Sequence, residues 1–338
     1  MNRQPLLSVI IISHNQKEML RRCVDSVLAQ RTSFPVEIIV SDDRSTDGTR
    51  EMLQSDYSDK VVISYCNSDE YETHYTFERA GYNRLNGLKA AHGKYIIHID
   101  GDDIFEGDSI FQCQVDVLER NPECSICVQN YKIADYKDIE HGDVALDRFI
   151  FKDNPIVSAA DFIQLIHYVP NSACCMRRVC LSQSLFVNLN GKTYDDWDIT
   201  YRYLGYGQVA LVDKADFVYI QHPNSFCHKN KSTDWSILAA SGLQGIRYVP
   251  NLSLPIIKSH YNSIWALAKM AWKRVRVSEE LIEYFKNDDM FIFNVFDNKY
   301  PLKNWLRINI IILWLIPIRF WGVKNNISWR ILYKLAIK

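Results

Sequence analysis

The stretch 90–103 reads AAHGKYIIHIDGDD, and it decides the fold class. Its centre, Tyr95–Ile99, is a short apolar run of the kind that forms a strand buried on both faces of a parallel sheet. Three carboxylates follow within four residues, at Asp100, Asp102 and Asp103. Such crowding is electrostatically costly unless a cation offsets it, so the stretch predicts a divalent metal site. A solvated acidic turn is the alternative.

The same pairing of an apolar strand with a polar loop occurs twice before this stretch. Residues 7–15 read LSVIIISHN, and residues 36–48 read VEIIVSDDRSTDG. Helical patterns follow each loop, so strands alternate with helices as in an α/β fold around a mostly parallel sheet. Ligands bind such sheets beyond the carboxyl ends of the strands. We therefore expect three loops, 13–15, 42–47 and 100–103, to converge on one edge.

The apolar periods predict the individual elements. We expect strands at 7–12, 36–40, 61–65, 95–99, 125–131, 209–212 and 217–220. We expect helices after Asn15, which suits an N-cap, and at 49 onward, 82–91, 108–120, 159–167 and 195–204. The acidic stretch 135–153 is predicted to be irregular, and the pattern from about 229 is helical.

Composition and charge exclude several classes of protein. The chain has 338 residues, 47% hydrophobic and 23% charged, which is enough to bury an ordinary core. The formal net charge of -1 provides no basic field for nucleic acid, so no nucleic-acid partner is expected. The average hides an asymmetry, because residues 298–338 contain eight basic residues and no acidic one.

Cysteine usage favours a reducing compartment. The nine cysteines are an odd number, scattered through the predicted strands and helices, and no secretory signal precedes the first strand. Cys124 and Cys127 form a CxxC, but no second CxxC or His pair stands at a zinc-site spacing. We interpret the cysteines as small buried hydrophobic residues and expect a cytoplasmic protein.

Four segments together resemble the family 2 glycosyltransferases. They are LSVIIISHNQKEMLRRCVDSVLAQ at 7–30, EIIVSDDRSTDGT at 37–49, GLKAAHGKYIIHIDGDD at 87–103 and YDDWDITYRYL at 194–204. The resemblance implies the GT-A fold and an inverting reaction, and it spans about Ser8 to His222. We accordingly predict a catalytic domain at 1–228 and a helical C-terminal region at 229–338.

The resemblance also implies where the nucleotide sugar binds. Ser13 and Asp43 would hold the nucleotide base, Arg84 would approach the diphosphate, and Asp100 would lie near the ribose. Chemically, the Asp43 carboxylate can accept the imide N–H of a uracil, and a guanidinium suits a diphosphate through paired hydrogen bonds. Local turn capping is the alternative for this loop, above all for Ser45 and Asp47, and a surface helix position is the alternative for Arg84.

The remaining site residues serve the metal and the acceptor. Asp102 and Asp103 would hold Mn²⁺ or Mg²⁺, and His222 would lie near the metal or be a structural histidine. The resemblance makes Asp196 the general base that deprotonates the acceptor hydroxyl. Inversion needs one such base and no protein nucleophile. The alternative for Asp196 is an acidic helix N-terminus.

The C-terminal segment favours contact with a membrane surface. Residues 305–321 read WLRINIIILWLIPIRFW, and the charge-free core of 308–318 is too short to span a bilayer. Tryptophans interleaved with Lys and Arg describe an interfacial element from about 298 onward, with a packed core helix as the alternative. We expect peripheral attachment to the cytoplasmic face of the inner membrane.

These expectations combine into one function. The protein would transfer a hexosyl or N-acetylhexosaminyl group from an NDP-sugar, preferably a UDP-sugar, to a hydroxyl of a glycan or lipid-linked glycan. Such a reaction suits bacterial surface-polysaccharide assembly. Two alternatives remain open: transfer to a polyprenyl phosphate, which needs no strong base, and a non-catalytic nucleotide-sugar binding protein.

Overall fold

The computed structural model describes residues 4–70, 76–163, 166, 169–178, 196–223, 225 and 249–251. The chain separates into two units, Met1–Leu267 and Ala268–Lys338, and every described residue belongs to the first. Apart from the turn at 249–251, the predicted helical region 229–338, with its membrane-binding segment from about 298, lies outside the described residues. Among the residues described, no helix is both long enough and apolar enough to cross a membrane.

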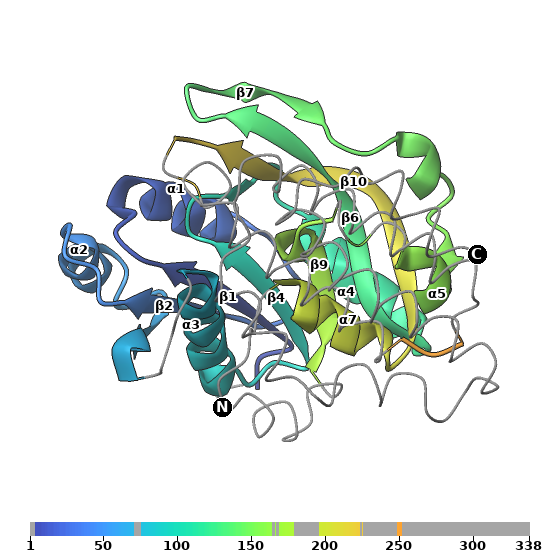
Figure 1. Cartoon of the computed structure of the whole chain (residues 1–338), viewed down its shortest axis with the longest axis horizontal. Helices are drawn as coiled ribbons and strands as arrows, with labels where there is room; N and C mark the ends of the chain where they lie inside the picture. The colour runs from blue at the N-terminus through green and yellow to red at the C-terminus, as the bar shows by residue number, and fades with distance from the viewer. Residues whose placement is uncertain are drawn as a thin grey trace, which may run out of the picture. The chain divides into compact units, whose positions relative to one another are not determined.

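The centre of the first unit is a single mixed sheet, shown in Figure 1, with the strand order β3-β2-β1-β4-β9-β6-β10-β5. Its first four strands are all parallel: β1 (Leu7–Ser13), β2 (Val36–Asp43), β3 (Val62–Cys66) and β4 (Tyr95–Asp100). β1 is buried along its whole length because helices cover both faces of the sheet. The α/β fold class is confirmed.

Beyond β4 the sheet becomes antiparallel in part. β9 runs antiparallel between β4 and β6, and β10 lies parallel to β6 with β5 at the far edge. β7 extends β6 as a hairpin, and β8 pairs with β10. These strands are β5 (Ile104–Phe105), β6 (Cys124–Asp135), β7 (Asp138–Val144), β8 (Ile156–Val157), β9 (Cys174–Arg177) and β10 (Gln208–Gln221).

The helices divide between the two faces according to the alternation of β1. Val9 and Ile11 pack in one core cluster with residues of α1 (Lys17–Leu28), α2 (Thr49–Asp56) and α4 (Ile110–Arg120). Ile10 and Ile12 point to the other face, where they pack with Leu88 of α3 (Thr76–Ala90). Side chains of a strand alternate between faces, so β1 is covered on both sides. Two short helices, α5 (Ala159–Phe162) and α7 (Asp196–Leu204), complete the described elements together with 3-10 turns.

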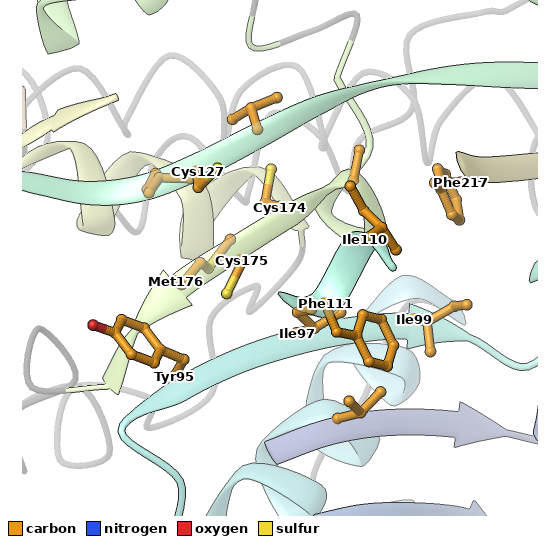
Figure 2. Close-up of a cluster of buried hydrophobic side chains, with 14 of the residues drawn as sticks. Tyr95, Ile97, Ile99, Ile110, Phe111, Cys127, Cys174, Cys175, Met176 and Phe217 are labelled. Atoms are coloured by element: carbon orange, nitrogen blue, oxygen red, sulfur yellow. The ribbon is translucent and has the colours of Figure 1, made fainter. Parts of the chain in front are cut away.

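The junction between β4, β9 and α4 is filled by apolar side chains and cysteines (Figure 2). Cys127 of β6 lies opposite Cys175 of β9 in the strand register, and both thiols are free and buried. Burial raises the pKa of the Cys127 thiol well above its usual range. These cysteines therefore behave as small hydrophobic residues.

Several elements differ from the prediction. The strands expected at 209–212 and 217–220 form one strand, β10, because the register shift between Val212 and Phe217 absorbs the polar residues between them. The stretch 135–153, predicted to be irregular, forms β7 and a 3-10 turn at Arg148–Phe151. β9 was not predicted, and α3 begins at Thr76 rather than at residue 82.

The start of the first helix is also a correction. α1 begins at Lys17, with Gln16 and not Asn15 at the N-cap position. Asn15 adopts a left-handed conformation with φ 53, and its side chain binds the loop after β2 instead of the helix end. An asparagine tolerates this conformation better than most residues. The Asn15 side chain therefore accepts a hydrogen bond from the loop after β2 instead of capping the helix.

Candidate active site

The ends of β1, β2 and β4 form one edge, as the sequence predicts. Ser13 at the end of β1 lies opposite Asp42 at the end of β2. Ile12 lies opposite Asp100, the last residue of β4. The three polar segments that follow these strands therefore lie side by side.

Hydrogen bonds join the first of these segments, after β1, to the other two. The Asn15 backbone N–H donates to Ser45 Oγ at 2.8 Å, and Asn15 Oδ1 accepts from the Thr46 N–H at 2.7 Å. Gln16 Nε2 donates to Asp102 Oδ2 at 3.0 Å. The loop after β2 and the acidic cluster are thus linked through two consecutive residues. Asn15 belongs to the loop 13–15 that was predicted to reach this edge, whereas Gln16 was not predicted. The only signal in the sequence is that both are polar residues directly after a buried strand.

The acidic cluster after β4 brings three carboxylates together. Ligand oxygens of Asp100, Asp102 and Asp103 lie within 4.8 Å of one another. Asp103 is almost completely buried, and its Oδ1 accepts the Ile220 N–H at 2.9 Å. Burial, with the negative charges of Asp102 and Asp100, raises the pKa of the Asp103 carboxyl well above its usual range. The positive charge of Arg84, which lies against Asp100, therefore compensates only part of the negative charge of the cluster.

A divalent cation fits this cluster. The donors are all carboxylate oxygens, the set that Mg²⁺ and Mn²⁺ prefer. The side chains of Asp100 and Asp102 are 33% and 17% exposed, so these two carboxylates are accessible from solvent, whereas Asp103 is buried. Among the described residues, this is the one group of three or more potential ligands close enough to share an ion.

Gly101 allows the acidic cluster to approach β1. Its N–H donates to the Ile12 carbonyl at 2.9 Å. A Cβ at this position would lie 2.8 Å from the same carbonyl oxygen, which is closer than real Cβ contacts. Only glycine therefore places the carboxylates at this distance from the first loop.

Arg84 extends from α3 to the cluster. Its Nη2 lies 2.8 Å from Asp100 Oδ1, and its side chain is only 5% exposed. The alternative of a surface helix arginine is therefore wrong. A buried guanidinium beside the carboxylates can bind a phosphate group through paired hydrogen bonds.

Asp43 is the last residue of β2, not part of the loop beyond it. Its Oδ1 accepts the Ser68 N–H at 3.1 Å, and its Oδ2 accepts the Ser68 hydroxyl at 2.7 Å and Arg79 Nη2 at 3.3 Å. Burial raises the pKa of the Asp43 carboxyl, but the Ser68 hydrogen bonds and the Arg79 charge outweigh burial and bring the pKa below its usual value. Asp43 is thus held as a carboxylate. Ser68 and Arg79 were not predicted.

Ser13, the last residue of β1, lies at the same sheet edge. Its side chain is buried, and its hydroxyl has no hydrogen-bond partner in the described part of the chain. Its carbonyl accepts Asn83 Nδ2 at 3.1 Å, which ties β1 to α3. The backbone is thereby fixed while the hydroxyl stays available.

His222 follows β10 and reaches the acidic cluster from the other side. Its Nε2 lies 2.9 Å from Asp102 Oδ2, and the ring is almost fully buried. Nδ1 is buried without a hydrogen-bond partner among the described residues. The structure therefore brings His222 together with Asp102, as the sequence predicts.

Asp196 is the first residue of α7. Its side chain and the whole of Asp195 lie outside the described residues. The role of Asp196 as a general base therefore stays a prediction. α7 itself is fixed to the sheet, since the Ser125 hydroxyl donates to the Tyr203 carbonyl at 2.8 Å.

Comparison with known sequences assigns the family. The model of Glycosyl transferase family 2 matches residues 8–180, which is more than half of the chain. Rv1520, an uncharacterized protein of Mycobacterium tuberculosis, is 27% identical over 228 residues, which cover 66% of this chain and 60% of that protein. TuaG of Bacillus subtilis, a putative teichuronic acid biosynthesis glycosyltransferase, is 30% identical over 152 residues, covering 44% of this chain and 54% of TuaG. The chain thus spans less than two thirds of the length of these relatives.

A solved structure agrees in fold. Residues 1–349 of TarS from S. aureus superpose with a TM-score of 0.58 at 18% identity, covering 86% of this chain and 80% of that one. The same part of TarS has also been solved in complex with UDP-GlcNAc. The chain belongs to glycosyltransferase family 2, with the GT-A fold, and the expected class of protein is confirmed.

Proposed function

We propose that this chain transfers a sugar from a UDP-sugar to a hydroxyl of a glycan or lipid-linked glycan, with inversion of the anomeric configuration. One observation carries the proposal: the acidic cluster of Asp100, Asp102 and Asp103 lies beside the buried Arg84 at the sheet edge that also holds Asp43. Base, diphosphate and metal would each meet a complementary group there. The UDP-GlcNAc complex of TarS supports a uridine donor.

Each residue at the edge would have one task. Asp43 would accept an N–H of the base, and the buried Ser13 hydroxyl at the end of the neighbouring strand β1 would provide a further polar contact. Arg84 would change partner from Asp100 to the diphosphate or bridge both, since a guanidinium has five N–H donors. Asp100 would then be free to bind the ribose.

Asp102 and Asp103, with His222 against Asp102, would hold Mn²⁺ or Mg²⁺. When bound, the ion supplies charge stabilisation for the departing nucleoside diphosphate. The Ile220 N–H fixes the carboxylate of the buried Asp103, and the Gln16 side chain orients the carboxylate of Asp102. The carboxylates would therefore be arranged before the ion arrives.

Asp196 would remove the proton from the acceptor hydroxyl as the new glycosidic bond forms. A single dedicated carboxylate suffices for an inverting transfer. The printed name of TuaG, which places it in teichuronic acid biosynthesis, supports a cell-surface polysaccharide as the product. The basic, tryptophan-rich segment from about 298 supports peripheral contact with the cytoplasmic face of a membrane, where a lipid-linked acceptor would be found.

The direct test is a thermal-shift screen of UDP-, GDP- and dTDP-sugars with and without Mn²⁺. A ligand that binds only the folded state raises the melting temperature by mass action. We expect the largest increase with a UDP-sugar plus Mn²⁺, and a loss of that increase in Asp102→Asn. A chain that none of these donors stabilises at millimolar concentration would contradict the proposal.

A further inference from the structure

A buried histidine without a hydrogen bond lies on the strand that leads to the acidic cluster. His98 of β4 is 1% exposed, and neither Nδ1 nor Nε2 has a hydrogen-bond partner among the described residues. Burial of a polar group without a hydrogen bond destabilises a folded protein, whereas an apolar side chain at the same place would carry no such penalty. A function of the ring in the site would account for the histidine.

The alternation of β4 directs the His98 ring toward α3. Ile97 and Ile99, on either side of His98, belong to the apolar cluster that Figure 2 shows. Successive side chains of a strand point to opposite faces, so His98 shares the other face with Ile96 and Asp100. Ile96 packs there in the core cluster that includes residues of α3. The ring and the first carboxylate of the acidic cluster therefore lie on the same side of the sheet, under the same helix.

Arg84 of α3 lies over this part of β4. α3 approaches the sheet so closely that a Cβ on Gly87 would lie 2.5 Å from Ile10 Cγ2, and Ile10 stands opposite His98 in the strand register. Arg84, one helical turn before Gly87, places its Nη2 2.8 Å from Asp100 Oδ1. Residues two apart on a strand are separated by about 7 Å, so the guanidinium that binds Asp100 is also close to the ring of His98.

The His98 ring offers Arg84 a hydrogen-bond acceptor. Burial, together with the positive charge of Arg84, lowers the pKa of His98 to about 3, so the ring is neutral. A neutral imidazole has one N–H donor and one acceptor nitrogen, whereas a guanidinium has five donors and no acceptor. The acceptor nitrogen of His98 and an N–H of Arg84 are therefore complementary. A leucine or phenylalanine at this position would fill the space and provide no acceptor.

We propose that His98 is a positioning residue for Arg84, and that its acceptor nitrogen binds the guanidinium when Arg84 turns from Asp100 to the diphosphate of the donor. A buried guanidinium needs partners for its N–H groups, because an uncompensated polar group in the interior is costly. Asp100 is one such partner in the structure. In the proposed function Asp100 binds the ribose instead, and the His98 nitrogen would take its place. The inference rests on that function and adds a residue that touches neither donor nor metal.

Calorimetric titration of the full chain with UDP and with UMP, both in the presence of Mn²⁺, tests the inference. The UMP-to-UDP ratio of dissociation constants measures what the second phosphate adds, because contacts to the base cancel. We expect His98→Leu to lower this ratio by roughly 10-fold, the loss expected for a hydrogen bond to a charged group. Its melting temperature should equal or exceed that of wild type, because a buried polar group without a partner is removed. His98→Phe is a second apolar variant with the same expected result.

Rescue and control variants separate hydrogen bonding from packing. His98→Asn and His98→Gln place an amide oxygen near Nδ1 and Nε2 of the ring, so at least one should keep the ratio within about threefold of wild type. Ile96→Val is the matched packing control, since Ile96 is fully buried on the same face; it should lower the melting temperature and leave the ratio unchanged. In the Arg84→Met background, His98→Leu should change the ratio no further, because both residues act on one contact.

The outcomes distinguish this inference from the proposed function. If wild type binds neither UDP nor UMP, the proposed function fails and the inference fails with it. If Arg84→Met keeps the wild-type ratio, the assignment of Arg84 to the diphosphate is wrong, and the inference falls while nucleotide binding stands. If Arg84→Met lowers the ratio but His98→Leu and His98→Phe do not, the inference alone is wrong. An equal loss in both apolar variants and both amide variants would also overturn it, because an acceptor would then make no difference.

Discussion

The two parts of the sheet differ in how they contribute to the site. The part formed by β3, β2, β1 and β4 is parallel throughout, and it carries the polar strand ends that gather as the candidate donor site. The part formed by β9, β6, β10 and β5 is mixed, and it supplies a backbone N–H from Ile220 and the ring of His222. The first part presents the chemistry, whereas the second holds the acidic cluster from behind.

This difference teaches where substitutions should act. Changes of the polar side chains at the strand ends of the first part should alter binding or turnover with little loss of stability, whereas the tightly packed Gly101 should affect both. Changes within the second part should alter stability with little effect on nucleotide affinity. Of the four variants below, Gln129→Leu and Gly101→Ala test this separation, and Asp196→Asn and Tyr57→Phe test the helices that flank the sheet.

The largest effect is expected from Asp196→Asn at the start of α7. Loss of a general base typically lowers turnover by about 10²- to 10⁴-fold, and donor affinity should remain near wild type. Steady-state kinetics with a glycan acceptor, together with UDP titration, measure both quantities. Near-normal turnover would remove Asp196 from this role and favour an acceptor that is already anionic.

The next effect is expected from Gln129→Leu, in the second part of the sheet. Gln129 Oε1 accepts the N–H groups of Asp216 and Phe217 at 3.1 and 3.2 Å, where β10 changes register. The buried N–H of Phe217 and the partly buried N–H of Asp216 would lose their acceptor, so we expect the free energy of unfolding to fall by about 2–4 kcal/mol. Denaturant titration measures this, with the exposed Gln208→Leu on β10 as control. A large loss of UDP affinity in folded Gln129→Leu protein would break the separation between the two parts.

A smaller loss of stability is expected from Gly101→Ala, and unlike Gln129→Leu this variant should also bind UDP more weakly. The added Cβ would displace the acidic cluster from Ile12, at a cost of about 1–3 kcal/mol in stability, and Mn²⁺-dependent UDP binding should weaken as well. Gly142→Ala on β7 is the matched control, because its Cβ would meet Ala134 at 3.2 Å, far less severely. Equal UDP affinity in Gly101→Ala and wild type would show that the approach of β4 to β1 does not matter for the donor.

The smallest effect concerns Tyr57, which closes α2 against α1. Its hydroxyl donates to Asp25 Oδ1 at 2.8 Å, and burial, together with Asp25, raises the pKa of Tyr57 to about 12. Unfolded tyrosine ionises near pH 10, so between pH 10 and 12 the native state holds a proton that the unfolded state has lost, and stability falls as the pH rises.

Tyr57→Phe removes this dependence. The variant should be less stable than wild type by about 1 kcal/mol at pH 8, because the hydrogen bond is lost. Toward pH 12 wild type should lose roughly 1–2 kcal/mol relative to the variant, so that the difference vanishes or reverses sign. Urea titrations at four pH values measure it, with the exposed Tyr206→Phe as control. A difference that is constant with pH would contradict the assignment.

The first part of the sheet could be predicted from the sequence because its information is local. Each strand there is an apolar run, and each run ends in polar residues that mark the site edge, as at Asp100. The second part depends on pairings between distant segments. β9 contains only Cys174–Arg177, too short to show a period, and it is a strand because β4 and β6 lie on either side of it.

The candidate site divides in the same way. The acidic cluster could be recognised because three carboxylates stand together in the sequence, and Arg84 because it matches a family position. Ser68 and Arg79 could not, because their approach to Asp43 depends on how β3 and α3 pack against β2. Asn15 was assigned to the wrong partner for a related reason: Thr46, in a loop 31 residues further along the chain, competes for its side chain.

The hydrogen bonds of Asn15 and Gln16 have a consequence for redesign of the enzyme. They join the segment after β1 to the segments after β2 and β4, so the three segments must be exchanged together if the hydrogen bonds are to be kept. A graft of the β2 loop alone from a relative with another nucleotide preference would leave Asn15 without its partners. A transplant of 13–17, 42–48 and 100–103 together would preserve them, and chimeras of this family should be cut at those boundaries.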